Sequence, residues 1–177
     1  NDVLGLSDAF LVSQQLTAHS EVVAVIPDAG TKSELDIFSS KIADLEQSVI
    51  GTVSENLCLE RFPGQGKSAL CPASATMKNG SDISNIVAKA FLTVTPSADI
   101  AIQNGGGVRV DVTAGDYTIA DAYTLLPFSN TLVTLEMSGQ EIVNALEDGI
   151  DYGLTDSTGS YPYASGLRFN VDASKAK

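Results

Sequence analysis

The chain has 177 residues, of which 44% are hydrophobic, enough to build the core of one ordinary domain. Its 10 lysines and arginines stand against 22 aspartates and glutamates, and this net charge of −12 argues against a binder of nucleic acid or anionic membranes. No apolar stretch reaches the length of about 18 residues that a transmembrane helix requires.

The first 30 residues carry the weakest pattern. They lack an initiator methionine and the basic-then-apolar form of a signal peptide, so we expect a mature or excised piece of a longer protein. Residues 21 to 26 (EVVAVI) favour a strand, and residues 27 to 30 (PDAG) favour a turn. Thr31 and Glu34 then have the spacing of a capping box, and apolar residues recurring at steps of three and four predict a helix over about 33 to 48.

The middle of the chain alternates between extended and helical patterns. Residues 49 to 60 are predicted to be extended, and the Gly/Pro/Ser-rich residues 62 to 80 to form a loop within the domain. Ser81 has the character of an N-cap, which predicts a helix over about 82 to 93. Its predicted apolar face comprises Ile83, Ile86, Val87, Ala90 and Phe91.

The C-terminal half continues this alternation. Residues 98 to 103 favour a strand, and Thr118 with Asp121 predicts a capped helix that ends before LLPF, ahead of Pro127. A strand over 131 to 137, a helix capped by Ser138 and Glu141, and a strand over 166 to 172 complete the series. Interleaved helices and strands indicate an α/β or α+β class.

Cys58 and Cys71 are the two cysteines, and they lack the C-x2-C spacing of a zinc site. The single histidine, His19, is far away in sequence, so we expect no metal site. A disulfide between the cysteines would contribute about 3 kcal/mol and would indicate an extracytoplasmic compartment. Two unrelated buried thiols are the alternative.

Gly105, Gly106 and Gly107 follow the predicted strand at 98 to 103 and precede Arg109. Glycines here allow positive φ, close approach of a ligand to the backbone, and an anion-binding nest of N–H groups. Arg109 adds a fork of donors for phosphate or carboxylate, and Asn104 adds a donor and an acceptor. Taken alone, the motif fits a structural turn with a solvent-facing arginine at least as well.

Two further residues are candidates for a ligand site. Phe128 follows a proline, so its ring could be held at the surface to stack on a planar base, although a core position is the default for a single phenylalanine. Arg61 lies close to Cys58 on a stretch that a disulfide would fix, although an ordinary surface arginine is the simpler interpretation. Tyr161 and Tyr163 are interpreted as packing residues.

The chain resembles the C-terminal domain of the 5'-nucleotidase family in four ordered segments, GSDISNIVAKAF, ADIAIQNGGGVR, LLPFSNTLVTLEMSGQEI and STGSYPYASGLRF. Members of this family are secreted, periplasmic or surface-anchored nucleotide phosphohydrolases. The resemblance covers about residues 33 to 177. The long insert at 58 to 80 is most similar to bacterial members that hydrolyse NAD or other nucleotides.

The resemblance implies an α+β fold, a mixed α/β layered sandwich, over residues 31 to 177. The helix at 33 to 48 would link it to a preceding domain, of which residues 1 to 30 would be the end. In the family, an N-terminal metallophosphoesterase domain holds two divalent metal ions and performs hydrolysis. Rotation of the C-terminal domain brings the bound nucleotide to those metals.

The matching motifs imply roles for individual residues. Asn104, Gly107 and Arg109 would contact the substrate, and Phe128 would form one face of an aromatic clamp around the base. Arg61 would correspond to a second substrate-binding arginine, although the loop that follows it is longer than the family's usual pattern.

The chain also departs from the family. It contains neither the second clamp aromatic with its GGDG-type acidic loop nor the Asp and His metal ligands of the catalytic domain. We therefore expect a periplasmic or secreted domain fragment, incomplete at its C-terminal end, that binds a nucleotide or nucleoside and has no catalytic residue of its own. It would dock against its own N-terminal metallophosphoesterase domain.

Two other hypotheses stay open at this point. The chain could be a non-catalytic extracytoplasmic nucleotide-binding module. It could also be a structural or interaction domain in which Arg109 and Phe128 have no chemical role.

Overall fold

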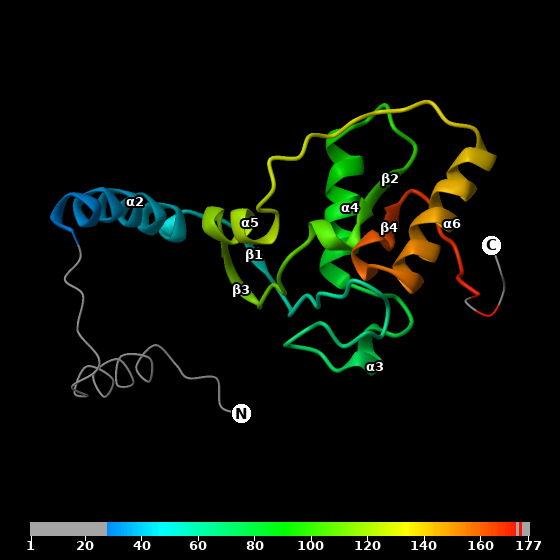
Figure 1. Cartoon of the computed structure of the whole chain (residues 1–177), viewed down its shortest axis with the longest axis horizontal. Helices are drawn as coiled ribbons and strands as arrows, with labels where there is room; N and C mark the ends of the chain where they lie inside the picture. Colours follow the sequence, from blue (N-terminus) through cyan, green and yellow to red (C-terminus); the bar gives the residue numbers. More distant parts are fainter. Residues whose placement is uncertain (1–27, 173, 175–177) are drawn as a thin grey trace. The chain divides into compact units, whose positions relative to one another are not determined.

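The computed structural model describes residues 28–172 and 174 (Figure 1). The chain divides into two compact units after Ile42, and the core and the candidate site both lie in the second. The strand predicted at 21 to 26 lies outside the described residues.

Helix α2 spans Ala29–Gln47 and confirms the predicted helix, with an earlier start. Its cap differs from the prediction, because the Asp28 carboxylate accepts the Thr31 N–H at 2.9 Å. This hydrogen bond lowers the pKa of Asp28. The capping box of Thr31 with Glu34 is therefore wrong. Within the described residues the turn predicted over 27 to 30 is also wrong, since helix already begins at Ala29.

Two small antiparallel sheets form the β-structure of the described residues. Strand β1 (Val49–Val53) pairs with β3 (Gly115–Thr118). Strand β2 (Ala101–Asn104) pairs with β4 (Pro162–Ser165). Together with the helices, these sheets confirm the predicted α+β class.

Helix α4 (Asp82–Val94) begins where predicted, because the Ser81 side chain accepts the Ser84 N–H. The helix packs against both β2 and β4 (Figure 1). Its predicted apolar face is only partly correct, because Ile86 and Ala90 are exposed and Ser84 is buried instead. The side of α4 that faces the sheet is therefore rotated relative to the predicted stripe.

Helices α5 (Ile119–Leu125) and α6 (Gly139–Thr155) both begin with the predicted capping boxes. In each box the cap hydroxyl accepts a backbone N–H, and an acidic residue three positions later accepts the N–H of the cap. At α6 these hydrogen bonds lower the pKa of Glu141. Helix α5 ends at Leu125, next to the stretch that Pro127 keeps from being helical.

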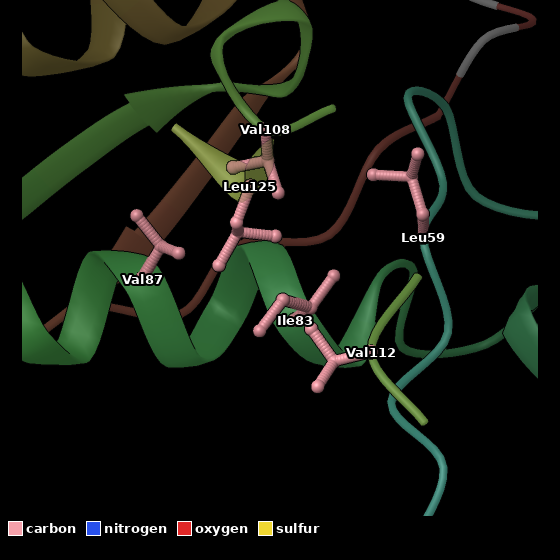
Figure 2. Close-up of a cluster of buried hydrophobic side chains, with 6 residues drawn as sticks. All are labelled: Leu59, Ile83, Val87, Val108, Val112 and Leu125. Atoms are coloured by element: carbon pink, nitrogen blue, oxygen red, sulfur yellow. The ribbon is translucent and has the colours of Figure 1, made fainter. Parts of the chain in front are cut away.

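The hydrophobic core packs helix α4 against segments that come before and after it in the chain. Its buried members come from well-separated parts of the sequence, so the core ties the loop after β1 to the segment after β2. Figure 2 shows these side chains, which are Leu59, Ile83, Val87, Val108, Val112 and Leu125.

Two predicted strands do not form. Residues 131 to 138 and 167 to 172 have no regular secondary structure, and the strand in the second region is β4, which ends at Ser165. Within the described residues neither segment pairs with another strand. Period-two alternation alone cannot form a sheet, because the backbone hydrogen bonds of a strand must come from a partner.

Candidate functional site

The three glycines form a 3-10 turn, η1 (Gly105–Gly107), at the end of β2. The predicted positive φ is wrong, because none of the three has one, and a nest needs alternating right- and left-handed residues. The Gly105 N–H is also already bonded to the Tyr161 carbonyl at 2.8 Å. The turn therefore lacks the left-handed residue of an αR-αL nest, and its first N–H is not available to an anion.

Close backbone packing explains the glycines instead. A Cβ on Gly105 would lie 2.8 Å from the Arg61 carbonyl oxygen, and one on Gly106 would lie 3.1 Å from the Cα of Gly159. The turn thus allows the Arg61 segment and the short helix η2 (Thr158–Ser160) to approach it from two sides. The Asn104 side-chain amide stabilises this contact by donating a hydrogen bond to the Gly159 carbonyl at 3.2 Å.

Arg109 is directed outward by its neighbours on the chain. Val108 is completely buried in the core, and the Arg109 N–H donates to the Leu125 carbonyl at 3.0 Å. Its guanidinium donates to the Gly106 carbonyl at 2.9 Å and lies over the Phe128 ring, 5.6 Å from its centre. One hydrogen bond leaves most of the five donors of this exposed guanidinium for a ligand.

Phe128 is 52% exposed, so the default core position does not apply to it. The stiff backbone after Pro127 leaves the ring at the surface, where Arg109 covers one of its faces. Tyr161 and Tyr163, in contrast, are buried, and their rings pack edge to face. Their interpretation as packing residues is confirmed.

Arg61 lies on a loop that is held in place by a disulfide and by several hydrogen bonds. The Cys58–Cys71 disulfide is present, with a Cα–Cα distance of 5.9 Å, which confirms the predicted pair. The Glu60 carboxylate is completely buried and accepts the N–H groups of Gly66 and Lys67 at 3.0 and 2.9 Å. It also accepts the Thr76 hydroxyl at 3.0 Å, from the short helix α3 (Ala73–Thr76), which sequence reasoning missed.

Asp111 is a second anchor of the same loop. Its carboxylate accepts the Leu59 N–H at 2.6 Å, the Ser68 hydroxyl at 2.7 Å and the Ala69 N–H at 2.8 Å. The loop around Arg61 is thus fixed by two carboxylates and one disulfide. The Nε atom of Arg61 is buried and, within the described residues, has no hydrogen-bond partner.

These segments surround an open pocket of about 520 Å³. All five residues nominated from the sequence line it, although they come from three separate stretches of chain. They are Arg61, Asn104, Gly107, Arg109 and Phe128.

Sequence reasoning missed part of the pocket wall. Asn130 lies two residues beyond Phe128, and Ser157, Gly159 and Ser160 belong to the η2 region. The segments LLPFSN and STGS contain these residues, but a short stretch that links two elements of secondary structure has no local signature of a ligand site. The contact of η2 with η1 brings Ser157, Gly159 and Ser160 to the pocket.

The pocket concentrates positive charge in an acidic protein. Two of the three arginines of the sequence line it, whereas no carboxylate does. Within residues 28–172 neither guanidinium forms a salt bridge. The arrangement offers an anion two unneutralised guanidinium groups beside an exposed aromatic ring.

Two kinds of feature are absent from the part of the chain that the structure describes. It contains no group of three or more His, Cys, Asp or Glu side chains that could hold a metal ion. None of its helices is long and apolar enough to cross a membrane.

The family model of the 5'-nucleotidase C-terminal domain matches residues 49–177. The chain belongs to this family. The C-terminal domain is 33% identical over 146 residues to the NAD 5'-nucleotidase of Haemophilus influenzae, covering 82% of this chain and 24% of that protein. It is 33% identical over 170 residues to a probable 5'-nucleotidase of Treponema pallidum, covering 93% of this chain and 27% of that protein.

Solved structures agree with this assignment of the 5'-nucleotidase C-terminal domain. A 5'-nucleotidase precursor from Thermus thermophilus aligns with a TM-score of 0.64 and 31% identity, over 81% of this chain and 26% of that one. The Haemophilus influenzae NAD nucleotidase aligns with a TM-score of 0.61 and 28% identity, over 98% and 31%. The chain therefore spans about a quarter of the length of the curated relatives it matches.

Proposed function

We propose that this domain recognises the nucleotide substrate of a 5'-nucleotidase that hydrolyses phosphate esters of extracytoplasmic nucleotides. The observation that carries the proposal is the meeting of Arg61, Arg109 and Phe128 at one pocket. Two positively charged guanidinium groups beside an aromatic ring match a nucleotide, which joins an anionic phosphate to a planar base.

The arginines form the phosphate end of the proposed site. The buried Nε of Arg61 lacks a partner within the described residues, and an unmade hydrogen bond of a charged group is costly. Because this Nε is closed to solvent, the Arg61 guanidinium, which lines the pocket, would bind a phosphate through its terminal N–H groups. Arg109, which lines the same pocket, would add further charge-assisted hydrogen bonds.

Phe128 forms the part of the proposed site that would bind the base. With Arg109 on one face of the ring, the other face is the stacking surface for a base. Asn104 and Gly107 also line the pocket and would contact the sugar or phosphate.

The chemistry is assigned to the parent protein. Two divalent metal ions in its N-terminal metallophosphoesterase domain would activate the attacking water, and this domain would dock against that one to position the phosphate. This chain would contribute binding and orientation, and the isolated fragment would be inactive. The name of the Haemophilus influenzae NAD nucleotidase, which matches both by sequence and by structure, extends the proposed substrates from mononucleotides to NAD. Its pyrophosphate would then be the bond cleaved, and nucleotide sugars are a further class.

A periplasmic or secreted location completes the proposal. The Cys58–Cys71 disulfide supports it, because structural disulfides persist in oxidising compartments.

Calorimetry on the full-length parent, with AMP, adenosine and NAD as ligands, tests the proposal. Arg109→Ala should weaken AMP binding at least tenfold and adenosine binding much less. Phe128→Ala should weaken all three. Arg168→Ala is the matched control, because Arg168 is exposed and does not line the pocket.

Two outcomes would contradict the assignment. Unchanged affinities in both variants would leave the pocket without a role in nucleotide recognition and would favour an interaction domain. Tight nucleotide binding by a parent that hydrolyses none of these ligands would favour a non-catalytic binding module.

A further inference from the structure

The two arginines of the pocket lie on chain segments that pair with each other. Leu57 and Val112 form an antiparallel bridge, in which each N–H donates to the other residue's carbonyl, at 2.8 and 3.0 Å. Arg61 follows Leu57 and Arg109 precedes Val112, so both arginines lie on the same side of the bridge. A group that joins the segments on this side therefore helps to set the separation of the two guanidinium groups.

The side chain of Asp111 is such a group. Its carboxylate accepts the Leu59 N–H at 2.6 Å. Regular antiparallel pairing would bring this N–H to the Val110 carbonyl, so the carboxylate takes the place of the backbone acceptor where the ladder stops. Leu59 is two residues from Arg61, and Asp111 is two residues from Arg109. This hydrogen bond therefore joins the two arginine-bearing segments directly.

The Asp111 carboxylate also holds the returning arm of the loop that carries Arg61. It accepts the Ser68 hydroxyl at 2.7 Å and the Ala69 N–H at 2.8 Å. The Ser68 oxygen in turn accepts the N–H of Cys71, the residue at which the disulfide closes the loop, at 3.0 Å. One side chain thus fixes both arms of the loop.

Glu60 differs from Asp111 in what it connects. Its carboxylate accepts hydrogen bonds from residues of the Arg61 loop itself, which are Gly66, Lys67 and Thr76. Glu60 therefore shapes the loop internally. Asp111 instead places the loop relative to the segment that carries Arg109.

We propose that Asp111 is a positioning residue of the nucleotide site, which sets the separation of the Arg61 and Arg109 guanidinium groups so that one phosphate can bind both. Asp111 does not line the pocket and, within residues 28–172, forms no salt bridge, so it acts through the backbone that it fixes. A pair of donors held in place before binding saves the cost of ordering them on the ligand. This role rests on the proposed function, in which the two arginines hold the phosphate.

The position requires a carboxylate. Three donors converge on Asp111, and an ionised carboxylate accepts hydrogen bonds without presenting a donor of its own. Asparagine would keep one accepting oxygen and turn its NH2 group towards a donor. At least one of the three hydrogen bonds would then be lost, and the loop would be released on that side.

A double-mutant cycle in the full-length parent tests the proposal by calorimetry and by the kinetics of AMP hydrolysis. Asp111→Asn should weaken AMP binding about tenfold, and adenosine binding less than about twofold, because adenosine has no phosphate to span the arginines. The KM for AMP should rise by a similar factor with little change in kcat. In the Arg61→Ala background the same substitution should have almost no further effect on AMP. Asp116→Asn, at an exposed position on β3, is the matched control.

Ser68→Ala provides a milder second variant, since it removes one of the three hydrogen bonds to Asp111 and leaves the other two. It should weaken AMP binding about two- to threefold, again with no further effect in the Arg61→Ala background. Unlike Asp111→Asn, it keeps the link between the two arginine-bearing segments, so it measures the contribution of the returning arm.

The results separate this role from the function on which it rests. If Asp111→Asn or Ser68→Ala weakens AMP and adenosine binding alike, or weakens AMP binding equally with and without Arg61, Asp111 is an ordinary structural residue and the proposal is overturned. Wild-type AMP affinity in both variants would overturn it as well. Wild-type AMP affinity in Arg61→Ala alone would instead contradict the proposed function.

Discussion

The guanidinium of Arg109 lies over the ring of Phe128, 5.6 Å from its centre. This contact couples the two ends of the proposed nucleotide site, because the group that would hold the phosphate also fixes the ring that would stack on the base. A planar guanidinium can stack and donate hydrogen bonds in its plane at the same time, which an ammonium group cannot.

Arg109→Lys in the full-length parent should therefore weaken AMP binding about tenfold although the charge is kept. Adenosine binding should change less, since the ring of Phe128 remains. Titration calorimetry measures both, and Arg168→Lys outside the pocket is the control. An AMP affinity equal to wild type would show that the guanidinium fork makes no specific contact.

The salt dependence of ligand affinity should distinguish the phosphate-binding part of the site from the base-binding part. Raising the ionic strength from about 50 to about 500 mM should weaken AMP binding, because the exposed Arg109 is screened, and should leave adenosine binding nearly constant. Parallel calorimetric titrations of the parent check this. An AMP affinity that ignores salt would mean that stacking dominates recognition.

Gly105→Ala should destabilise the fold, because the new Cβ would lie 2.8 Å from the Arg61 carbonyl oxygen. We expect a loss of about 1–3 kcal/mol in the free energy of unfolding, measured in urea, and weaker AMP binding by the parent as Arg61 is displaced. Gly139→Ala is the control, since no atom lies within 4 Å of its Cβ position. Equal stabilities of the two variants would contradict the role assigned to close packing.

Glu60→Gln should loosen the loop that carries Arg61. The buried carboxylate accepts three hydrogen bonds, and an amide group would present a donor where an acceptor is required. Urea unfolding should show a loss of about 1–3 kcal/mol. Glu55→Gln, on an exposed position of the same segment, should have little effect.

Alkaline pH should unfold the domain through its buried tyrosines. Burial raises the pKa of Tyr163 far above its ordinary value of 10.0, and burial also raises the pKa of Tyr161. Below pH 10 the phenols are neutral in both states; above it, only the unfolded chain releases these protons, so stability falls as pH rises. Unfolding free energies at a series of pH values between about 8 and 11 measure this slope.

Tyr163→Phe separates the contribution of this residue. It removes the hydrogen bond that the Tyr163 hydroxyl accepts from the Ser81 N–H, which should cost about 1 kcal/mol near pH 8. It should also flatten the decline above pH 10. A slope identical to wild type would assign the alkaline sensitivity elsewhere.

Local chemistry in the sequence determined the helices. Ser81, Thr118 and Ser138 cap helices where a hydroxyl or carboxylate meets a free N–H within one turn, so the signal needs no distant partner. The sequence has only two cysteines, so a disulfide could join only this pair, and the structure shows that it forms. At α2, capping by a side-chain oxygen was possible at two positions, and the Asp28 carboxylate caps the helix at the earlier one.

Tertiary structure decided the sheets and the shape of the glycine turn. Residues 131–137 alternate as a strand does but have no partner among the described residues, and a strand exists only when another backbone supplies its hydrogen bonds. The role of Gly105 depends on the distant Arg61 carbonyl, which no local pattern contains.

The candidate site divides in the same way. Motifs nominated Asn104, Gly107, Arg109, Phe128 and Arg61 one by one from the sequence, where each had an ordinary structural explanation. Their meeting at one pocket, together with Ser157 and Ser160, depends on contacts between chain segments that are far apart in sequence. The sequence shows which chemical groups each segment carries. Only the folded backbone brings groups from distant segments together into a binding site.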